Sequence, residues 1–297
     1  MKRPLISVIL GSFNQKEVLV KVIDSFANQT MPADEYELVV VDSSSSDGSD
    51  KLLASFKPSC HFQYQVCENK GKTAARNKAI ELAKSDIILI TDADMIADKN
   101  LVKTHYLAHK NADKPTCFEG LTYNLTKLEW PTDRNNLSPY IKRNYRLNAK
   151  LGWWYFLTGN ISLPKKVFFD ANGFSEEFTG YGWEDLELGY RLSQNKTPLR
   201  YLKTAVNYHY HVITEEEEIE RNINKGKSAK VFLSKHPGLK MFLGLNPLSI
   251  YIYRRIRKNG PVYNWFQNMC FKSNFKPLHK FGFWFLKEYN YLEGILS

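Results

Sequence analysis

Short apolar runs alternate with segments of helical spacing through the first ninety residues of the chain. Apolar runs bounded by turn residues or polar residues predict buried strands at residues 6–10 and 37–42, and further strands are predicted at residues 62–66 and 86–90. The intervening segments predict helices at residues 17–27, around 52–56 and at 72–84. Strands that alternate with helices in this way form a parallel sheet with helices on both faces. The predicted fold class is therefore α/β, Rossmann-like, with a mostly parallel central sheet.

The pattern loosens after residue 95. A further strand is predicted at residues 158–163 and a helix at 184–192. Thr214 and Glu217 have the spacing of a capping box, which predicts a helix that starts with an acidic first turn at 215–218.

The positive charge of the chain is concentrated at its C-terminus. The 297 residues include 41 Lys and Arg against 31 Asp and Glu, a net charge of +10. Residues 237–297 alone have a net charge of +7 and contain 14 of the 41 aromatic residues. Such a local excess argues against a nucleic-acid-binding protein, and no nucleic-acid partner is expected. Two interpretations of the segment remain open: peripheral contact with anionic lipid headgroups, or packing on the rest of the chain or on a second copy in a homo-oligomer.

Features that would place the chain in or across a membrane are missing from the sequence. No window approaches about 18 consecutive apolar residues, and the first ten residues lack the pattern of a secretory signal. The four cysteines are scattered without a CxxC pair, which is typical of thiols in a reducing compartment. The expected location is the cytoplasm, with a peripheral position on the inner face of the plasma membrane as the alternative that the basic segment adds.

Polar residues follow three of the predicted strands, at Asn14, at Asp42, and at Asp92 with Asp94. In open α/β sheets, ligands bind at the carboxyl ends of the strands. Two carboxylates in an Asp-x-Asp arrangement can face one hard cation together with phosphate oxygens. The same residues also occur in ordinary surface loops, and Asp42 could equally cap a helix. The spacing alone therefore leaves a structural interpretation open.

Further motifs occur in a set order, at residues 7–14, 28–30, 38–48, 68–71, 75–80 and 86–94. Considered in that order, these segments resemble family 2 glycosyltransferases, which are inverting nucleotide-sugar enzymes of the GT-A fold. The resemblance implies a GT-A domain at residues 1–236, with a nucleotide-binding half at about 1–95 and an acceptor half at about 96–236. Residues 237–297 would form a basic, aromatic, helical C-terminal extension.

The resemblance also implies roles for residues of the first half. Asp42 would hydrogen-bond uracil, and Asp92 would contact the ribose or the sugar. Asp94 would hold Mn²⁺ or Mg²⁺ against the diphosphate. The remaining nucleotide-sugar contacts implied by the family are Ser12, Asn14, Asn69, Gly71 and Arg76.

The second half contains a stretch, residues 178–192, that looks like the Gly-x-Gly-x-Glu-Asp motif of galactosyltransferase-type enzymes. By that resemblance Asp185 is the catalytic base and Glu184 binds donor or acceptor hydroxyls, with Trp183 beside them. Gly159 and Asn160 belong to a segment that lies along the donor sugar in the family. Relatives also provide a metal-binding histidine where this chain has His209 and His211; His211 is favoured, and His209 is the alternative.

The sequence thus predicts a metal-dependent, inverting glycosyltransferase. It would move a hexose or N-acetylhexosamine from a UDP-sugar to an oligosaccharide or a lipid-linked glycan, in bacterial surface polysaccharide synthesis. The alternative is a catalytically inactive glycan- or membrane-binding protein on the same scaffold. A dehydrogenase is excluded because no G-x-G-x-x-G follows the first strand.

Overall fold

The computed structural model describes residues 3–131, 134, 137–139 and 145–297. The chain forms two compact units. The first comprises Met1–Glu176 with Asp185–Val212, and the second comprises Glu177–Glu184 with Ile213–Ser297. The boundary differs from the one expected at residue 236, because the helix after residue 213 belongs to the C-terminal helices.

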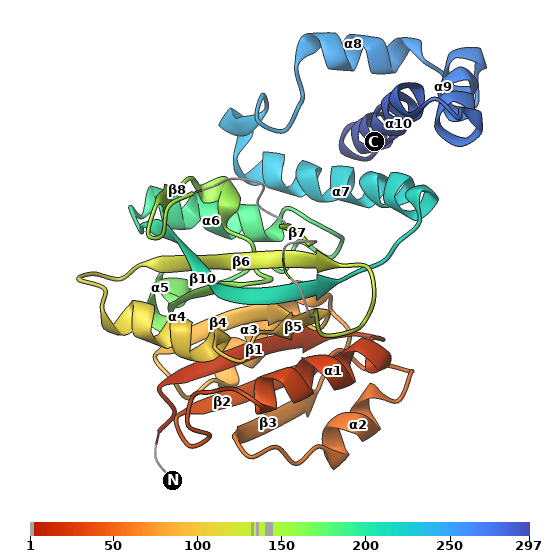
Figure 1. Cartoon of the computed structure of the whole chain (residues 1–297). Helices are drawn as coiled ribbons and strands as arrows, with labels where there is room; N and C mark the ends of the chain where they lie inside the picture. Colours follow the sequence, from red (N-terminus) through yellow and green to blue (C-terminus); the bar gives the residue numbers. More distant parts are fainter. Residues whose placement is uncertain (1–2, 132–133, 135–136, 140–144) are drawn as a thin grey trace. The chain divides into compact units, whose positions relative to one another are not determined.

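The first unit is built on one ten-stranded sheet (Figure 1). Its main path runs through β3 (His61–Val66), β2 (Tyr36–Asp42), β1 (Ile6–Ser12), β4 (Ile87–Asp92), β9 (Ile161–Pro164), β6 (Cys117–Leu125), β10 (Leu199–Tyr210) and β5 (Met95–Ala97). Two short strands flank this path, β7 (Ser138–Pro139) on β6 and β8 (Lys150–Leu151) on β10.

The four strands predicted in the first ninety residues are confirmed as β1 to β4, and they pair in parallel. In the other half, β9 runs antiparallel to β4 and β6, whereas β6 and β10 are parallel. Since β9 is antiparallel to both of its neighbours, β1, β2, β4, β6 and β10 all end at the same edge of the sheet. We call it the carboxyl edge.

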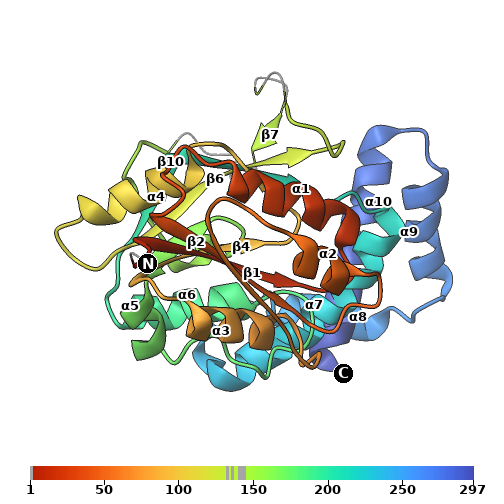
Figure 2. The ribbon, with the colours of Figure 1, turned by 90° about the horizontal axis from the view of Figure 1, so that it is seen from below.

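Helices cover both faces of the sheet (Figure 2). One face carries α1 (Lys16–Ala27), α2 (Ser49–Ser55) and α4 (Leu101–Lys110); the other carries α3 (Lys72–Leu82), α5 (Lys165–Asp170) and α6 (Glu184–Gln194). The strands supply both cores by alternation: Val8 and Leu10 enter the first core and Ile9 enters the second. The 3-10 turn Trp153–Tyr155 leads into the segment before β9.

The second unit is helical. It contains α7 (Glu215–Lys235), the 3-10 turn Pro237–Leu239, α8 (Pro247–Arg255), α9 (Pro261–Lys272) and α10 (Lys276–Leu296). The predicted capping box of α7 is confirmed: Thr214 Oγ1 accepts from the Glu217 amide at 3.2 Å, and Glu217 Oε2 accepts from the Thr214 amide at 2.9 Å. Helices α7 and α10 approach closely at Gly226 and Gly294, where a Cβ on either glycine would overlap backbone atoms of the other helix. Within the described residues, no helix combines the length and the apolar character needed to cross a bilayer.

Two histidines under β9, His105 buried and His109 partly buried, make the stability of the first unit sensitive to acid. His105 bonds to Ser162 Oγ at 2.7 Å and to Asn160 Oδ1 at 2.9 Å, and His109 bonds to the same hydroxyl at 2.8 Å. Burial lowers the pKa of His105 to about 4 against the effect of the Asn160 hydrogen bond. Burial, with the neighbouring His105, lowers the pKa of His109 to about 3. Both imidazoles are therefore neutral in the folded protein at pH 7.

We expect the free energy of unfolding to fall as the pH drops below about 6.5. Below that pH the two imidazoles bind protons in the unfolded chain but stay neutral in the folded chain, because folding lowers their pKa. The stabilisation is complete above that pH, and each imidazole removes up to about 1.4 kcal/mol per pH unit below it. Urea denaturation at about pH 7 and pH 5 measures the change. The H105Q/H109Q double variant serves as the comparison: if its stability falls as steeply, other groups are responsible.

Candidate active site

The carboxyl edge brings together the polar residues that follow β1, β2 and β4. The parallel register places Ser12 beside Asp42, and Gly11 beside Asp92. Ser12 Oγ is buried and has no hydrogen-bond partner among the described residues. Buried hydroxyls are normally satisfied, so an orphaned one at a strand end marks a place where a ligand can bind.

Asp42 holds a serine-rich loop in place. Its side chain is fully buried, and its carboxylate accepts from the Ser45 amide at 2.8 Å and from Ser45 Oγ at 2.6 Å. Asn14, which has a left-handed φ of 49°, joins the same loop: its Oδ1 accepts from the Ser46 amide at 2.8 Å. The sequence predicts a direct bond from Asp42 to a base. The structure places Ser45 on both carboxylate oxygens, so Asp42 orders the loop at this end of the sheet, and its bond to uracil stays a prediction.

Asp92 lies between two cations of α3. Arg76, which is fully buried, forms an ion pair with Asp92 Oδ1, and Lys72 Nζ lies 3.1 Å from the same oxygen. Burial alone would raise the pKa of Asp92, but the guanidinium of Arg76 and the ammonium of Lys72 lower it well below the usual range. Asp92 is therefore ionised at any physiological pH and neutralises part of a positive cluster.

The same arginine connects Asp92 with Asp185. Arg76 Nη1 lies 3.3 Å from Asp185 Oδ1, and Asp185 Oδ2 accepts from the Thr158 amide at 3.2 Å. About a fifth of the Asp185 side chain is exposed, so the carboxylate is oriented but still reaches solvent. Thr158 Oγ1 beside it is buried and has no hydrogen-bond partner in the described part of the chain.

A second cluster forms around Asp94, in the turn between β4 and β5. The antiparallel pairing of β5 with β10 sets His209 opposite Met95. His209 Nε2 and His211 Nδ1 lie 3.5 and 3.7 Å from Asp94 Oδ2, and the two rings are stacked with centroids 5.5 Å apart. The structure therefore brings both histidines to Asp94, where the sequence leaves the choice between them open.

These three residues fit a divalent metal ion. Their donor atoms all lie within 4.8 Å of one another. Asp94 Oδ1 is buried and accepts no hydrogen bond from any described residue, so an oxygen is left for a cation. Carboxylates and imidazoles together bind divalent transition metals, whereas Mg²⁺ prefers oxygen ligands alone.

Three further residues that the sequence predicts for the site, Asn69, Gly71 and Gly159, lie in turns and strand ends of the first unit. Asn69 and Gly71 form an exposed turn before α3, in which Asn69 Oδ1 accepts from the Gly71 amide at 3.1 Å. Gly159 lies against Met95, close to the Asp94 turn, and its carbonyl accepts from Thr91 and from Asn207.

Asn160 and Trp183 are both held by contacts within the protein. Asn160 is buried and bonds to His105 and to the Leu121 and Ala205 carbonyls, so it joins strands instead of facing a ligand. Trp183 belongs to the helical unit, where its ring packs against Phe232, Phe242 and Tyr291. Glu184 begins α6 directly before Asp185, and its side chain is buried.

Two residues near the site are absent from the sequence prediction. Lys72 lies one helical turn before Arg76, and this spacing on one helix face is the signal that could have found it. Glu119 is a lone acid within the apolar strand β6. Its Oε2 accepts from the Leu157 amide at 3.1 Å, next to the amide that Asp185 holds. Burial raises the pKa of Glu119 well above its usual value against that hydrogen bond, and the Asp185 charge raises it further. Burial therefore favours the protonated, neutral form of Glu119.

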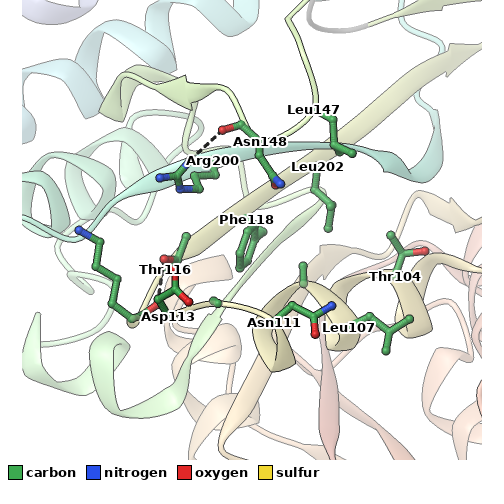
Figure 3. Close-up of a pocket in the computed structure, with 13 residues that line it drawn as sticks. Thr104, Leu107, Asn111, Asp113, Thr116, Phe118, Leu147, Asn148, Arg200 and Leu202 are labelled. Atoms are coloured by element: carbon green, nitrogen blue, oxygen red, sulfur yellow. Dashed lines mark hydrogen bonds between the residues drawn. The ribbon is translucent and has the colours of Figure 1, made fainter.

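A groove of about 750 Å³ lies at the opposite end of β6 and β10 (Figure 3). Thr116, Phe118 and Arg200 line it near the starts of these strands, and Arg200 Nη1 donates to the Asn148 carbonyl at 2.9 Å. It contains none of the predicted site residues, so the candidate site is the carboxyl edge.

Comparison with known proteins agrees with this architecture. The solved structure of Staphylococcus aureus TarS in complex with UDP superposes with a TM-score of 0.60 at 15% identity, covering 99% of this chain and 90% of that one. A mannosyltransferase from Pyrobaculum calidifontis in complex with GDP-Man and Mn²⁺ gives a TM-score of 0.60 at 17% identity, covering 99% and 88%. These likenesses confirm the expected GT-A fold class.

Sequence comparison finds relatives and a family. Validoxylamine A glucosyltransferase of Streptomyces hygroscopicus is 26% identical over 80% of this chain and 62% of its own, and the Escherichia coli chondroitin synthase is 24% identical over 78% and 38%. The chain thus spans less than two thirds of the curated relatives it matches. Residues 139–215 match the N-terminal domain of galactosyltransferase. Residues 7–171, more than half of the chain, match glycosyl transferase family 2, and the chain belongs to that family.

Proposed function

We propose that the protein is a metal-dependent, inverting glycosyltransferase that uses a UDP-sugar. The observation that carries the proposal is the carboxyl edge itself, where Arg76 joins Asp92 to Asp185 and where Asp94 meets two histidines. TarS has been solved with UDP and with UDP-GlcNAc, which supports UDP as the nucleotide. Chondroitin and hyaluronan synthases among the relatives support a glycan acceptor and a role in surface polysaccharide synthesis.

In the proposed reaction, Asp185 accepts the proton of an acceptor hydroxyl. That oxygen attacks the anomeric carbon, the bond from this carbon to the UDP oxygen breaks on the opposite face, and UDP leaves with the bonding electrons. Arg76 and the Thr158 amide hold the Asp185 carboxylate in a fixed orientation. Lys72 and Arg76 place positive charge beside Asp92, where a diphosphate would bind. A metal ion bound by Asp94, His209 and His211 would offset the charge that develops on UDP.

The nucleotide pocket is proposed at the ends of β1 and β2. Ser12 offers an unpartnered hydroxyl, while Asp42 and Asn14 fix the loop that would meet the base and ribose. Asn69 and Gly71 belong to a turn that would lie beside the ribose and diphosphate. Gly159 would lie along the donor sugar, and Glu184 would bind sugar hydroxyls.

A donor screen tests the proposal. Purified protein with Mn²⁺ and a panel of nucleotide sugars should release UDP slowly from one UDP-sugar, and that sugar should raise the melting temperature. Binding without any turnover, across all donors and glycan acceptors tried, would favour an inactive glycan-binding protein on this scaffold.

Glu119 is proposed to position the Leu157–Thr158 backbone as a neutral acid. We expect E119Q to keep kcat within about twofold at pH 7, since the amide retains the acceptor for the Leu157 amide without adding charge. E119A should lose about 1–3 kcal/mol of stability, because that amide then lacks its partner. If E119Q lost activity as E119A does, the carboxyl group itself would be required and the proposed role would be wrong.

The C-terminal helices are proposed to contact anionic lipid on the cytoplasmic face of the membrane, where a lipid-linked acceptor would be within reach. Large apolar side chains are exposed along them, among them Leu248, Tyr251, Trp265, Phe275, Phe281 and Trp284. On α10, Leu278, Phe281 and Trp284 follow one another at three-residue spacing with Lys276 and Lys280 nearby, as in helices that lie in the interface plane. The charge complements anionic headgroups.

We expect the protein to sediment with vesicles that contain phosphatidylglycerol and not with pure phosphatidylcholine. The W265S/W284S variant should lose most of this binding, whereas W130S, which replaces an exposed tryptophan of the sheet unit, should not. Dimerisation in analytical ultracentrifugation without vesicle binding would instead assign the surface to a second copy of the chain.

A further inference from the structure

Three helices of the second unit bring a cysteine, a histidine and a glutamate together. Glu215 is the first residue of α7, Cys270 lies in the last turn of α9, and His279 lies in the first turn of α10. Their donor atoms all lie within 4.8 Å of one another, and His279 Nε2 lies 3.0 Å from Glu215 Oε2. None of the three belongs to the site at the carboxyl edge.

We propose that Glu215, Cys270 and His279 form a zinc site. Thiolate, imidazole and carboxylate are the ligands that Zn²⁺ uses in proteins. Tetrahedral coordination at the usual bond lengths separates nitrogen and oxygen donors by about 3.3 Å, so the observed pair needs to open by only a few tenths of an ångström. Cys270 is buried whereas Glu215 is exposed, which leaves a fourth position open to water on the glutamate side.

Close packing of α9 against α10 holds Cys270 and His279 near each other before any ion binds. The rings of Phe266 on α9 and Phe285 on α10 stack with centroids 3.6 Å apart. At Gly282 of α10 the helices are so close that a Cβ would overlap the Cys270 amide nitrogen. Binding converts the Cys270 thiol to a thiolate and releases its proton to solvent. The ion would then connect all three helices and stabilise the folded unit. This site is independent of the proposed transferase activity.

The two proposed metal sites differ in the ions they prefer. A thiolate is a soft ligand, and Mn²⁺ and Mg²⁺ bind sulfur poorly, so the site at Cys270 prefers Zn²⁺. Full-length protein carrying D94N, freed of metal by chelation, is titrated with Zn²⁺ by calorimetry and with Co²⁺ by absorbance. We expect one equivalent to bind, a sulfur-to-cobalt charge-transfer band to appear, and Zn²⁺ to raise the melting temperature.

C270S should abolish the band, and H279Q and E215Q, which change more exposed positions, should each weaken Zn²⁺ binding at least about tenfold. C60S, at a buried cysteine of the sheet unit, is the matched control and should leave the band intact. Absence of zinc binding in the D94N protein, or a cobalt–thiolate band that survives C270S, would overturn the proposal and leave a simple His279–Glu215 hydrogen bond.

Discussion

The D185N variant is expected to lose glycosyl transfer by at least about 100-fold in kcat while it still binds UDP with metal. The amide cannot accept the proton of the acceptor hydroxyl at neutral pH. Asparagine is nearly isosteric with aspartate and can still accept from the Thr158 amide, so the backbone that Asp185 holds should stay in place. Steady-state kinetics with the donor found in the screen, together with calorimetry of UDP binding, separates chemistry from binding.

A matched control is D170N, which removes an exposed carboxylate that pairs with Lys166 on α5. It should keep the wild-type rate, since an exposed pair of this kind contributes little to stability. The melting temperature of D185N checks that the variant folds. A D185N protein that retained most of its rate would remove Asp185 from the role of base.

The fold of about residues 1–95 can be predicted from the local pattern of apolar and polar residues, whereas the arrangement of the rest of the chain cannot. Apolar runs identify β1, β2 and β4, because strands buried on both faces are apolar throughout, whereas β3 at the edge of the sheet is only partly buried. The close approach of α7 and α10 at Gly226 and Gly294 brings together residues 68 positions apart, and nothing near either glycine indicates its partner. The capping box therefore locates the start of α7 but does not place that helix with the C-terminal helices.

In the candidate site, too, some residues are predictable from local pattern, and others depend on contacts between distant segments. Asp92 and Asp94 are predictable because a strand end sets their position. The two histidines reach Asp94 only through the pairing of β5 with β10, a contact between distant segments. Asn160 stands next to a glycine in a motif-like segment, yet strand pairing turns its amide into the interior. Trp183 has a left-handed φ of 72°, which a sequence pattern does not reveal for a bulky residue.

The D94N variant is expected to lose the metal dependence of UDP binding altogether. Asp94 Oδ2 is the atom that both histidines approach, and Oδ1 is the buried oxygen that a cation would satisfy. Replacing one of the oxygens by an amide nitrogen removes the negative charge on which binding of a divalent ion depends. Calorimetric titration of UDP with and without Mn²⁺ should give the same weakened affinity in D94N, at least about 100-fold below that of the wild type with Mn²⁺.

The H209Q and H211Q variants test whether one imidazole or both bind the metal ion. If both imidazoles bind the ion, each variant should retain metal-dependent binding that is weaker by about 10- to 100-fold. If one histidine only orients the other through the stacked rings, its variant should bind Mn²⁺ nearly as the wild type does. D34N, at an exposed aspartate in the turn before β2, is the control and should leave the titration unchanged. A D94N protein whose UDP affinity still rose with Mn²⁺ would show that the ion binds elsewhere, and the metal site at the carboxyl edge would be refuted.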